Sequence, residues 1–192
     1  NQIRTGMYIA IREGSACKDL LNLVSGVNSS NERRTMFCTD DRHPGDIMNV
    51  GHIDNNVRLA IKSGVDPITA IRMATLNTAE CYHLRRKGAI APGYDANFII
   101  VDNLEDFNVL ETYVDGNKIT EDWHKDIVVA KEVTDLATNT INVANVTLDD
   151  LKIPLTSNNV NVIKIIPESV VTEKVERIVT IEGGYFKRTD DV

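Results

Sequence analysis

The first half of the chain alternates short apolar runs with longer segments in which apolar residues recur at helical spacing. The runs 7–11 and 35–39 are short and partly β-branched, as expected of fully buried strands. Each leads through a polar loop into a helical pattern, first over residues 16–24, with Ser15 as the expected N-cap, and then over residues 53–61. Two successive strand–loop–helix units predict neighbouring parallel strands whose loops share one edge of a sheet.

The pattern then changes to antiparallel β structure. Asp66-Pro67 supplies an N-cap and a first-turn proline for a helix predicted over 66–82. The β-branched run 97–101 predicts a strand, and residues 109–119 have an Asp-Gly pair at the centre, which is typical of a two-residue hairpin turn. Further strands are predicted over 160–166 and 177–181, whereas the polar stretch between the hairpin and residue 150 has no clear period.

The composition indicates a folded protein and argues against a membrane protein and a nucleic-acid-binding protein. The chain has 192 residues, 42% of them hydrophobic, with 21 Lys and Arg against 28 Asp and Glu, which describes a folded protein with a net charge of −7. No run approaches the roughly 18 apolar residues of a membrane-spanning helix, so we expect no membrane insertion. The acidic excess lies in the second half and would repel phosphate backbones, so we expect no nucleic-acid partner.

Cysteine usage and the first residue add two expectations. Three cysteines, an odd number at wide spacing, argue against a disulfide framework and for a reducing compartment, so we expect a cytoplasmic protein. The sequence opens on Asn1, directly before an apolar run, and we expect it to be a piece of a longer protein.

Ionisable residues gather where the two predicted strands end. Asp40 and Asp41 follow the second strand, and carboxylates held there can ligate a cation and accept a proton from water. The alternative is that both aspartates cap the turn and pair with Arg42. Glu13 is either a pocket acid or a partner of Arg12, and His52 belongs either to a helix cap or to a pocket.

Complete catalytic motifs of several classes are missing from the sequence. It has no His-x-His, His-Glu-x-x-His or Cys-x-x-Cys pattern, so a whole metal site cannot be assembled from it. It also has no phosphate-binding Gly-x-x-x-x-Gly-Lys loop, which leaves a nucleotide triphosphatase or dinucleotide enzyme without support.

Four ordered motifs are similar to one known family. Ile-Arg-Glu-Gly-Ser-Ala (11–16), Phe-Cys-Thr-Asp-Asp-Arg-His-Pro (37–44), Gly-His-Ile-Asp (51–54) and Gly-Ala-Ile-Ala-Pro-Gly-Tyr (88–94) resemble, in order and spacing, the bacterial-type adenine deaminases of the amidohydrolase superfamily. The resemblance is clearest over residues 4–120. It implies an α/β fold in which 7–11 and 35–39 are the last two strands of a TIM-type (β/α)8 barrel. The implied domains are a C-terminal barrel part (1–90), a small β-sandwich segment (91–120) and a mixed α/β, mostly β, C-terminal region (121–192).

The same resemblance implies an activity and a site. The full-length protein would hydrolyse adenine to hypoxanthine and ammonia with a divalent transition metal, manganese or iron or else zinc, and would form a homo-oligomer. Asp40 would be both metal ligand and catalytic base. The implied substrate-binding residues are Asp41, Arg42, Glu13, Ser15 and His52.

Two alternatives to this activity stay open. The protein could be another amidohydrolase that acts on a cyclic amidine or amide, or the chain could be a non-catalytic association module. Because the family's remaining metal ligands would lie outside these residues, we expect this chain alone to bind no metal and to be inactive.

Overall fold

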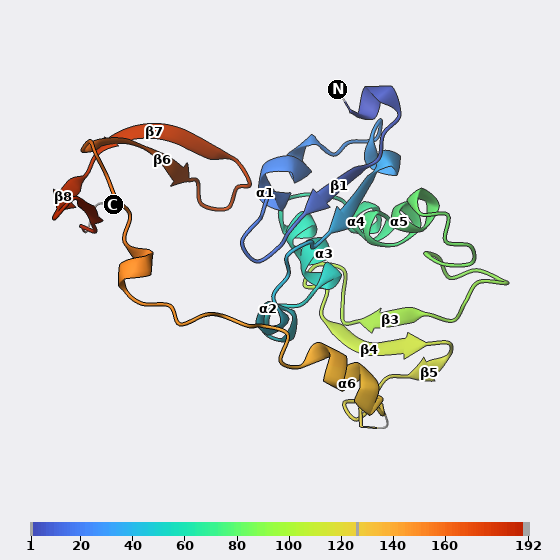
Figure 1. Ribbon diagram of the computed structural model, residues 1–192. Helices are drawn as coiled ribbons and strands as arrows, with labels where there is room; N and C mark the ends of the chain where they lie inside the picture. The colour runs from blue at the N-terminus through green and yellow to red at the C-terminus, as the bar shows by residue number, and fades with distance from the viewer. Residues whose placement is uncertain (1, 126, 190–192) are drawn as a thin grey trace. The chain divides into compact units, whose positions relative to one another are not determined.

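In the computed structural model, which describes residues 2–125 and 127–189, the two apolar runs form parallel strands (Figure 1). Strand β1 (Ile9–Arg12) pairs with β2 (Thr35–Cys38), in a register that joins Ile9 to Thr35 and Arg12 to Cys38. The predicted parallel pair is therefore confirmed. Since both strands run the same way, the loops that follow Arg12 and Cys38 leave from the same edge.

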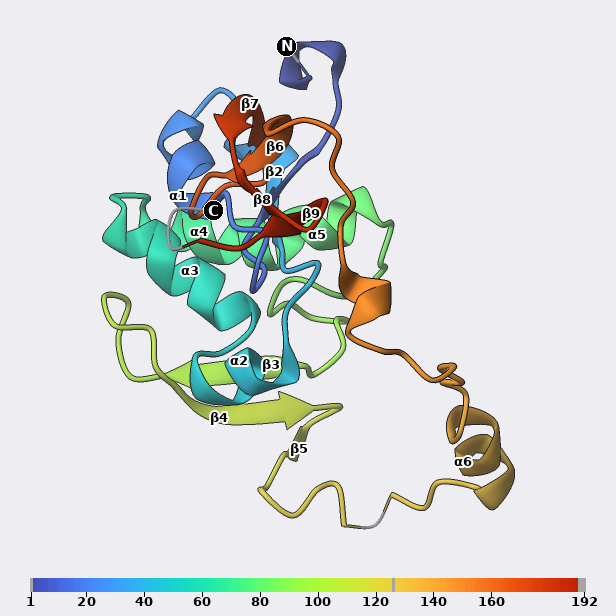
Figure 2. The same cartoon turned by 60° about the vertical axis from the view of Figure 1, so that its left-hand side comes forward.

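Short helices follow each strand and pack against the pair. Figures 1 and 2 show α3 and α4 beside the two strands. The amphipathic segment before residue 64 is a helix as predicted, and His43 and Asp66 cap two of the others by accepting backbone N–H bonds from Gly45 and Thr69. The elements of this region are η1 (Ile3–Thr5), α1 (Leu20–Leu23), η2 (Val24–Gly26), η3 (Glu32–Arg34), α2 (Pro44–Asn49), α3 (Ile53–Lys62), α4 (Pro67–Ala74) and α5 (Leu76–Cys81).

Two helix predictions need correction. The helix predicted over 16–24 begins only at Leu20, because the backbone N–H groups of Ala16 and Cys17 donate to the distant Asp41 carboxylate. Ser15 is thus no helix cap. The helix predicted over 66–82 breaks at Thr75, which has φ −125° and ψ −85° and whose hydroxyl bonds back to the Ile71 carbonyl.

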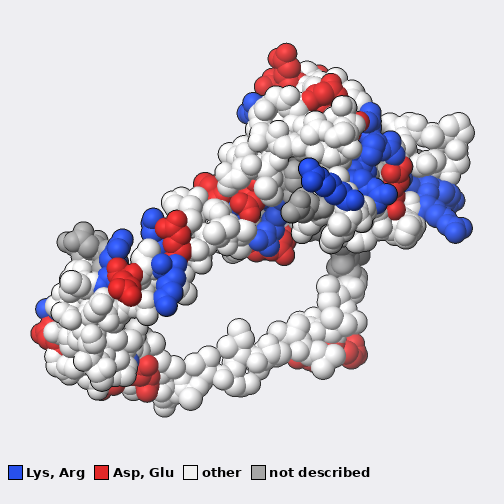
Figure 3. Space-filling model, turned by 90° about the horizontal axis from the view of Figure 1, so that it is seen from above, with Lys and Arg blue, Asp and Glu red and all other residues white. Residues whose placement is uncertain are grey.

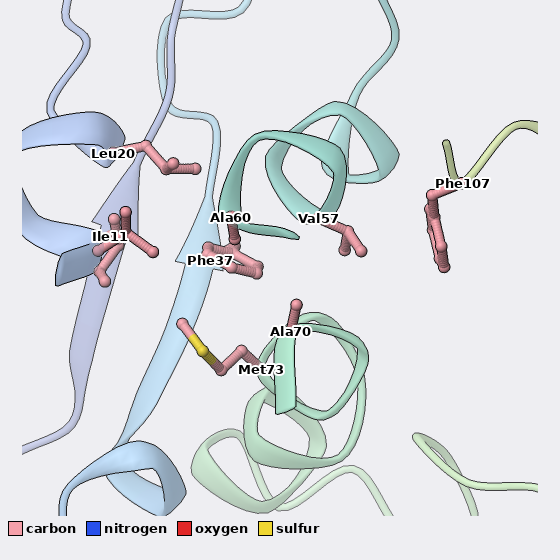
Figure 4. Close-up of a cluster of buried hydrophobic side chains, with 9 residues drawn as sticks. Ile11, Leu20, Phe37, Val57, Ala60, Ala70, Met73 and Phe107 are labelled. Atoms are coloured by element: carbon pink, nitrogen blue, oxygen red, sulfur yellow. The ribbon is translucent and has the colours of Figure 1, made fainter. Parts of the chain in front are cut away.

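The hydrophobic core lies between the strands and the helices. Ile11 and Phe37 are register partners on β1 and β2, and both side chains are buried against α3 and α4 (Figure 4). Because side chains alternate along a strand, Arg12 and Cys38 lie on the opposite face of the pair. The core cluster comprises Ile11, Leu20, Val24, Phe37, Val57, Ala60, Ala70, Met73 and Phe107.

The next part of the chain is an antiparallel three-stranded sheet. It consists of β3 (Phe98–Val101), β4 (Val109–Val114) and β5 (Asn117–Lys118), in the order β3-β4-β5. The predicted hairpin turn is confirmed. Its two central residues have positive φ, 49° at Asp115 and 79° at Gly116, as the favoured two-residue hairpin turn requires.

The chain divides into two compact units. One contains the residues up to Glu121 together with Pro167–Val170, and the other contains Asp122–Ile166 and the residues from Val171 onward. The second unit holds α6 (Lys131–Ala137), η4 (Asp149–Leu151) and two antiparallel hairpins, β6 (Asn159–Ile165) with β7 (Thr172–Ile178) and β8 (Thr180–Glu182) with β9 (Tyr185–Lys187). Asn1, Asp126 and 190–192, which belong to the predicted regions 1–90 and 121–192, lie outside the described residues.

The strand predicted over 177–181 is wrong as a single element. It spans the end of β7 and the start of β8, and Val179 between them donates its backbone N–H to Asn158. The partner strand therefore changes at this residue. The predicted strand 160–166 agrees with β6 within one residue at each end.

Charged side chains of both signs are interspersed on the face of each unit seen in Figure 3. In the second unit, Lys164 pairs with Glu173 at 2.9 Å and Lys187 with Glu182 at 2.5 Å. Among the described residues, no helix is long and apolar enough to cross a bilayer.

Asn77 provides a test of how α5 is held against β2. Its side chain is fully buried, and its amide donates to the backbone carbonyls of Glu32 and Thr35, both at 2.7 Å. Asn77→Ala leaves these carbonyls without that donor and should lower the free energy of unfolding by about 2–3 kcal/mol. The measurement is urea unfolding followed by circular dichroism. Asn49→Ala, at an exposed position of α2, serves as the control and should change stability by less than about 0.5 kcal/mol.

Candidate active site

Asp40 lies just beyond the end of β2 and faces the end of β1. Its Oδ2 atom is 2.5 Å from Nη1 of Arg12, the last residue of β1. The two side chains are partly exposed, 55% for Asp40 and 30% for Arg12. Asp40 has a φ of 54°, a left-handed conformation that aspartate tolerates better than most residues, and this turns the chain sharply after the strand.

Asp40 and Arg12 line a shallow pocket of about 290 Å³. The walls come from both strands, from Asp40 after β2, and from Asp19 and Leu23, which flank and end α1. Arg12 and Cys38 contribute from the sheet face opposite the core, as the alternation of side chains predicts. The complete lining is Ala10, Arg12, Asp19, Leu23, Cys38 and Asp40.

Asp41 points away from this pocket and binds the loop that follows β1. Its Oδ2 accepts hydrogen bonds from the backbone N–H groups of Ala16 (2.9 Å) and Cys17 (3.1 Å). These two bonds lower the pKa of the Asp41 carboxyl, because they favour the charged form. Gly14 leaves the necessary space, since a Cβ atom there would lie 1.6 Å from Oδ1 of Asp41.

Further contacts join the same two loops. The hydroxyl of Ser15 donates to the Asp46 carboxylate and accepts the backbone N–H of His43 at 2.7 Å. Arg42 donates from Nη1 to the carbonyl of Gly14 and from Nε to the carbonyl of Gly51, both at 3.2 Å. We call the contacts between residues 14–17 and residues 41–46 the loop latch.

Arg42 does not pair with either aspartate, in contrast to the turn-capping alternative. Its guanidinium instead bridges two backbone carbonyls, and its buried Nη2 atom has no hydrogen-bond partner among the described residues. Arg12, which sequence reasoning considered only as a partner of Glu13, takes the place beside Asp40.

Glu13 is buried, with only 6% of the residue exposed. Its side chain is held by the backbone N–H of Leu20, and its own backbone N–H donates to the Cys38 carbonyl at 3.0 Å. Burial raises the pKa of the Glu13 carboxyl, and the hydrogen bond from Leu20 and the charge of Lys18 offset this only in part.

His52 lies next to the residue that precedes Asp40. Its Nε2 atom is 3.1 Å from Oγ1 of Thr39, and its side chain makes no capping bond to α3. Of the six site residues expected from the sequence, the structure thus places Asp40 at the pocket, Asp41, Arg42 and Ser15 in the loop latch, Glu13 in a buried position and His52 behind Thr39. Arg12, Asp19 and Cys38 were missed as pocket residues, although the two-residue period of the strands marks Arg12 and Cys38.

The side chains around Asp40 determine whether this pocket could hold a metal ion. Among residues 2–125 and 127–189, no group of three or more His, Cys, Asp or Glu side chains is placed to hold one. A carboxylate at the end of a strand is nevertheless a suitable oxygen ligand for a divalent cation. The residues present therefore fit one ligand of a metal site, and further ligands would have to come from outside them.

Comparison with known proteins places these features in context. The model of the amidohydrolase family matches residues 9–119. The chain is 45% identical over 188 residues to an adenine deaminase of Clostridium acetobutylicum, covering 97% of this chain and 33% of that protein. It is 41% identical over 189 residues to the adenine deaminase of Geobacillus kaustophilus, covering 96% of this chain and 33% of that protein.

The chain therefore spans about a third of the length of the curated relatives it matches. Among solved structures, the β-aspartyl dipeptidase of Fervidobacterium islandicum matches with a TM-score of 0.47 and 20% identity, over 62% of this chain and 34% of that one.

The loop latch can be tested through Gly14 and Asp41. Gly14→Ala places a methyl group where the Asp41 carboxylate lies, so it should break the bonds to Ala16 and Cys17 and lower the melting temperature by a few degrees. Asp41→Ala should lower it similarly. In the double variant the collision is gone, so the two losses should not add. Additive losses in differential scanning calorimetry would contradict the latch.

The buried Glu13 predicts a pH dependence of stability. Because its pKa is raised in the folded state, the folded protein keeps this proton to higher pH than the unfolded chain does. Its stabilising contribution is therefore present at low pH and lost as the pH rises through the raised pKa. Glu13→Gln should be more stable than the parent at about pH 7 but not at about pH 4. Thermal melts at both pH values measure this, with the exposed Glu105→Gln as the control.

Proposed function

This chain belongs to the amidohydrolase family, and on that premise we propose that it is the C-terminal portion of an adenine deaminase. The full-length protein hydrolyses adenine, giving hypoxanthine and ammonia. The observation that carries the proposal is the position of Asp40: a carboxylate directly after a parallel strand, facing a pocket, in a sequence 45% identical to a known adenine deaminase. In parallel α/β enzymes, catalytic groups lie at this end of the strands.

The proposal extends to the fold. We propose that β1 and β2 are the last two strands of a (β/α)8 barrel, although the described residues contain no closed barrel. Residues 1–90 would then be barrel, 91–120 a segment of a β-sandwich and 121–192 an appended, mostly β region. Helices α3 and α4 pack against the Ile11 and Phe37 face of the strand pair, so the face with Arg12 would be the one turned toward the barrel interior.

Asp40 has two roles in this proposal. A divalent transition metal held by Asp40 and by ligands outside this chain would activate water as a Lewis acid; manganese, iron or zinc would serve. Asp40 takes a proton from the attacking water, which adds at C6 of adenine. It would then deliver this proton to a ring nitrogen and pass a second proton, from the hydroxyl group added at C6, to the amino group, which leaves as ammonia while C6 becomes a carbonyl.

The neighbouring residues keep Asp40 in position. Asp41, Ser15 and Arg42 connect the loops that follow the two strands, so they bear on substrate binding by fixing the shape of the pocket rim. Glu13 and His52 lie behind the same rim, in contact with Leu20 and Thr39, and would support the loops that hold the substrate. A homo-oligomeric, cytoplasmic enzyme remains the expectation for the whole protein.

The two aspartates provide the test of this assignment. In the full-length protein, Asp40→Asn should reduce kcat for adenine by more than about 10⁴-fold, since it removes both the base and a metal ligand. Asp41→Asn keeps an oxygen for the Ala16 and Cys17 amides, so it should cause a smaller loss, with a raised KM. Steady-state kinetics with parallel metal analysis distinguish the two variants.

Two outcomes would count against this function. Full activity of Asp40→Asn would remove the base from the mechanism, and loss of metal only in Asp41→Asn would reverse the roles. A purified parent protein that hydrolyses a cyclic amidine or amide but not adenine would favour a different amidohydrolase.

A further inference from the structure

A second pocket lies where the chain turns after α5 (Figure 1). Its volume is about 430 Å³, and it shares no lining residue with the pocket at Asp40. Within five positions of the sequence, its lining gathers the nitrogen-bearing side chains of His83, Arg85, Arg86 and Lys87. The chain as a whole has a net charge of −7, so this local excess of cations does not follow from composition. The proposed deaminase activity uses none of these residues.

The turn that carries these side chains is held closely against α5. His83 and Arg86 have φ of 55° and 62°, a left-handed conformation that is uncommon for residues other than glycine. The backbone N–H of Leu84 donates to a carbonyl of α5 at 2.8 Å, and a Cβ atom at Gly88 would lie only 2.9 Å from Cα of Leu76. Packing on α5 therefore maintains an unfavourable backbone path, and this path surrounds one pocket with successive basic side chains.

The positive charge of this turn is neutralised only in part. Asp95 pairs with Nη2 of Arg86 and Nζ of Lys87, each at 3.0 Å, and its backbone N–H donates to the Arg86 carbonyl. The hydrogen bond from Lys87 and the charges of both cations lower the pKa of the Asp95 carboxyl. Within residues 2–125 and 127–189, the Arg85 side chain has no hydrogen bond or ion pair. Its guanidinium is therefore available to an anion.

Apolar and aromatic side chains complete the lining. They come from α5, Leu84 and Tyr94, and such surfaces cover the flat, uncharged part of a ligand. Glu80 also lines the pocket, but Arg33 pairs with it at 2.7 Å. A guanidinium binds phosphate through two parallel hydrogen bonds, and a phosphate monoester carries about two negative charges at neutral pH. The lining thus matches a ligand with a phosphate group at one end and an apolar ring at the other.

We propose that this pocket binds a small phosphate monoester with a flat apolar part. The phosphate lies against Arg85 and Arg86, with Asp95 holding Arg86 in place, and the apolar part lies against Leu84 and Tyr94. The inference is independent of the proposed function, because it takes no residue from the site at Asp40.

The test is a calorimetric titration of the full-length protein with phenyl phosphate. Inorganic phosphate and phenol each keep one half of this probe, so both should bind several-fold more weakly. Dimethyl phosphate, a singly charged diester like those of nucleic acids and phospholipids, should also bind more weakly. These three comparisons separate a site for a monoester from general attraction to phosphate.

Variants of the lining should change the affinity in opposite directions. Arg85→Gln removes a cation and should raise the dissociation constant of phenyl phosphate on the order of five- to tenfold. Glu80→Gln removes a negative charge from the lining and should lower it. Arg177→Gln, which removes an exposed arginine outside the lining, should leave it unchanged, and so should Asp40→Asn.

Several outcomes would overturn this inference. They are a parent protein that does not bind phenyl phosphate, an affinity unchanged by Arg85→Gln, and equal affinities for phenyl phosphate and dimethyl phosphate. Loss of binding in Asp40→Asn would place the probe in the other pocket and would overturn it as well. A full-length protein that binds phenyl phosphate in this manner but does not hydrolyse adenine would leave the inference intact and contradict the proposed function.

Discussion

The parallel pairing of β1 and β2 determines the arrangement of everything around Asp40. It places the loops after Arg12 and after Cys38 at one edge, where the Asp41 carboxylate accepts the backbone N–H groups of Ala16 and Cys17. Those amides would be unpaired donors in a free loop. A carboxylate that accepts two of them fixes the loop with charge-assisted bonds, which are stronger than neutral ones. Gly14 is required because the carboxylate fills the space of its side chain.

Consecutive aspartates can serve different purposes because the backbone turns between them. Asp40 has a φ of 54°, and the chain leaves the strand direction at this residue. As a result, the Asp40 carboxylate faces Arg12 and the pocket, while that of Asp41 faces the amides of the neighbouring loop. Asp40 therefore borders the pocket, while Asp41 holds the neighbouring loop. The charge of the Asp40 carboxylate is balanced by Arg12 at the end of the neighbouring strand.

The local pattern of apolar residues predicts the strands and the hairpin. It does not predict element boundaries that are set by contacts between residues far apart in the sequence. The runs 7–11 and 35–39 are apolar and β-branched, and burial on the core side makes them strands. Residues 16–19 have a helical pattern, yet the amides of Ala16 and Cys17 donate to Asp41, which lies more than 20 residues away in sequence. Likewise, the change of partner at Val179 depends on Asn158 and not on neighbouring residues. Propensity carries no information on such contacts.

The sequence predicts part of the candidate site in the same way, through local pattern. Asp40 follows from a charged residue placed after a buried strand, but its partner Arg12 depends on the register of a second strand. The face of the strand pair that bears Ile11 and Phe37 is filled by α3 and α4. A molecule that contacts Asp40 must therefore approach from the opposite face, where Arg12 and Cys38 line the pocket.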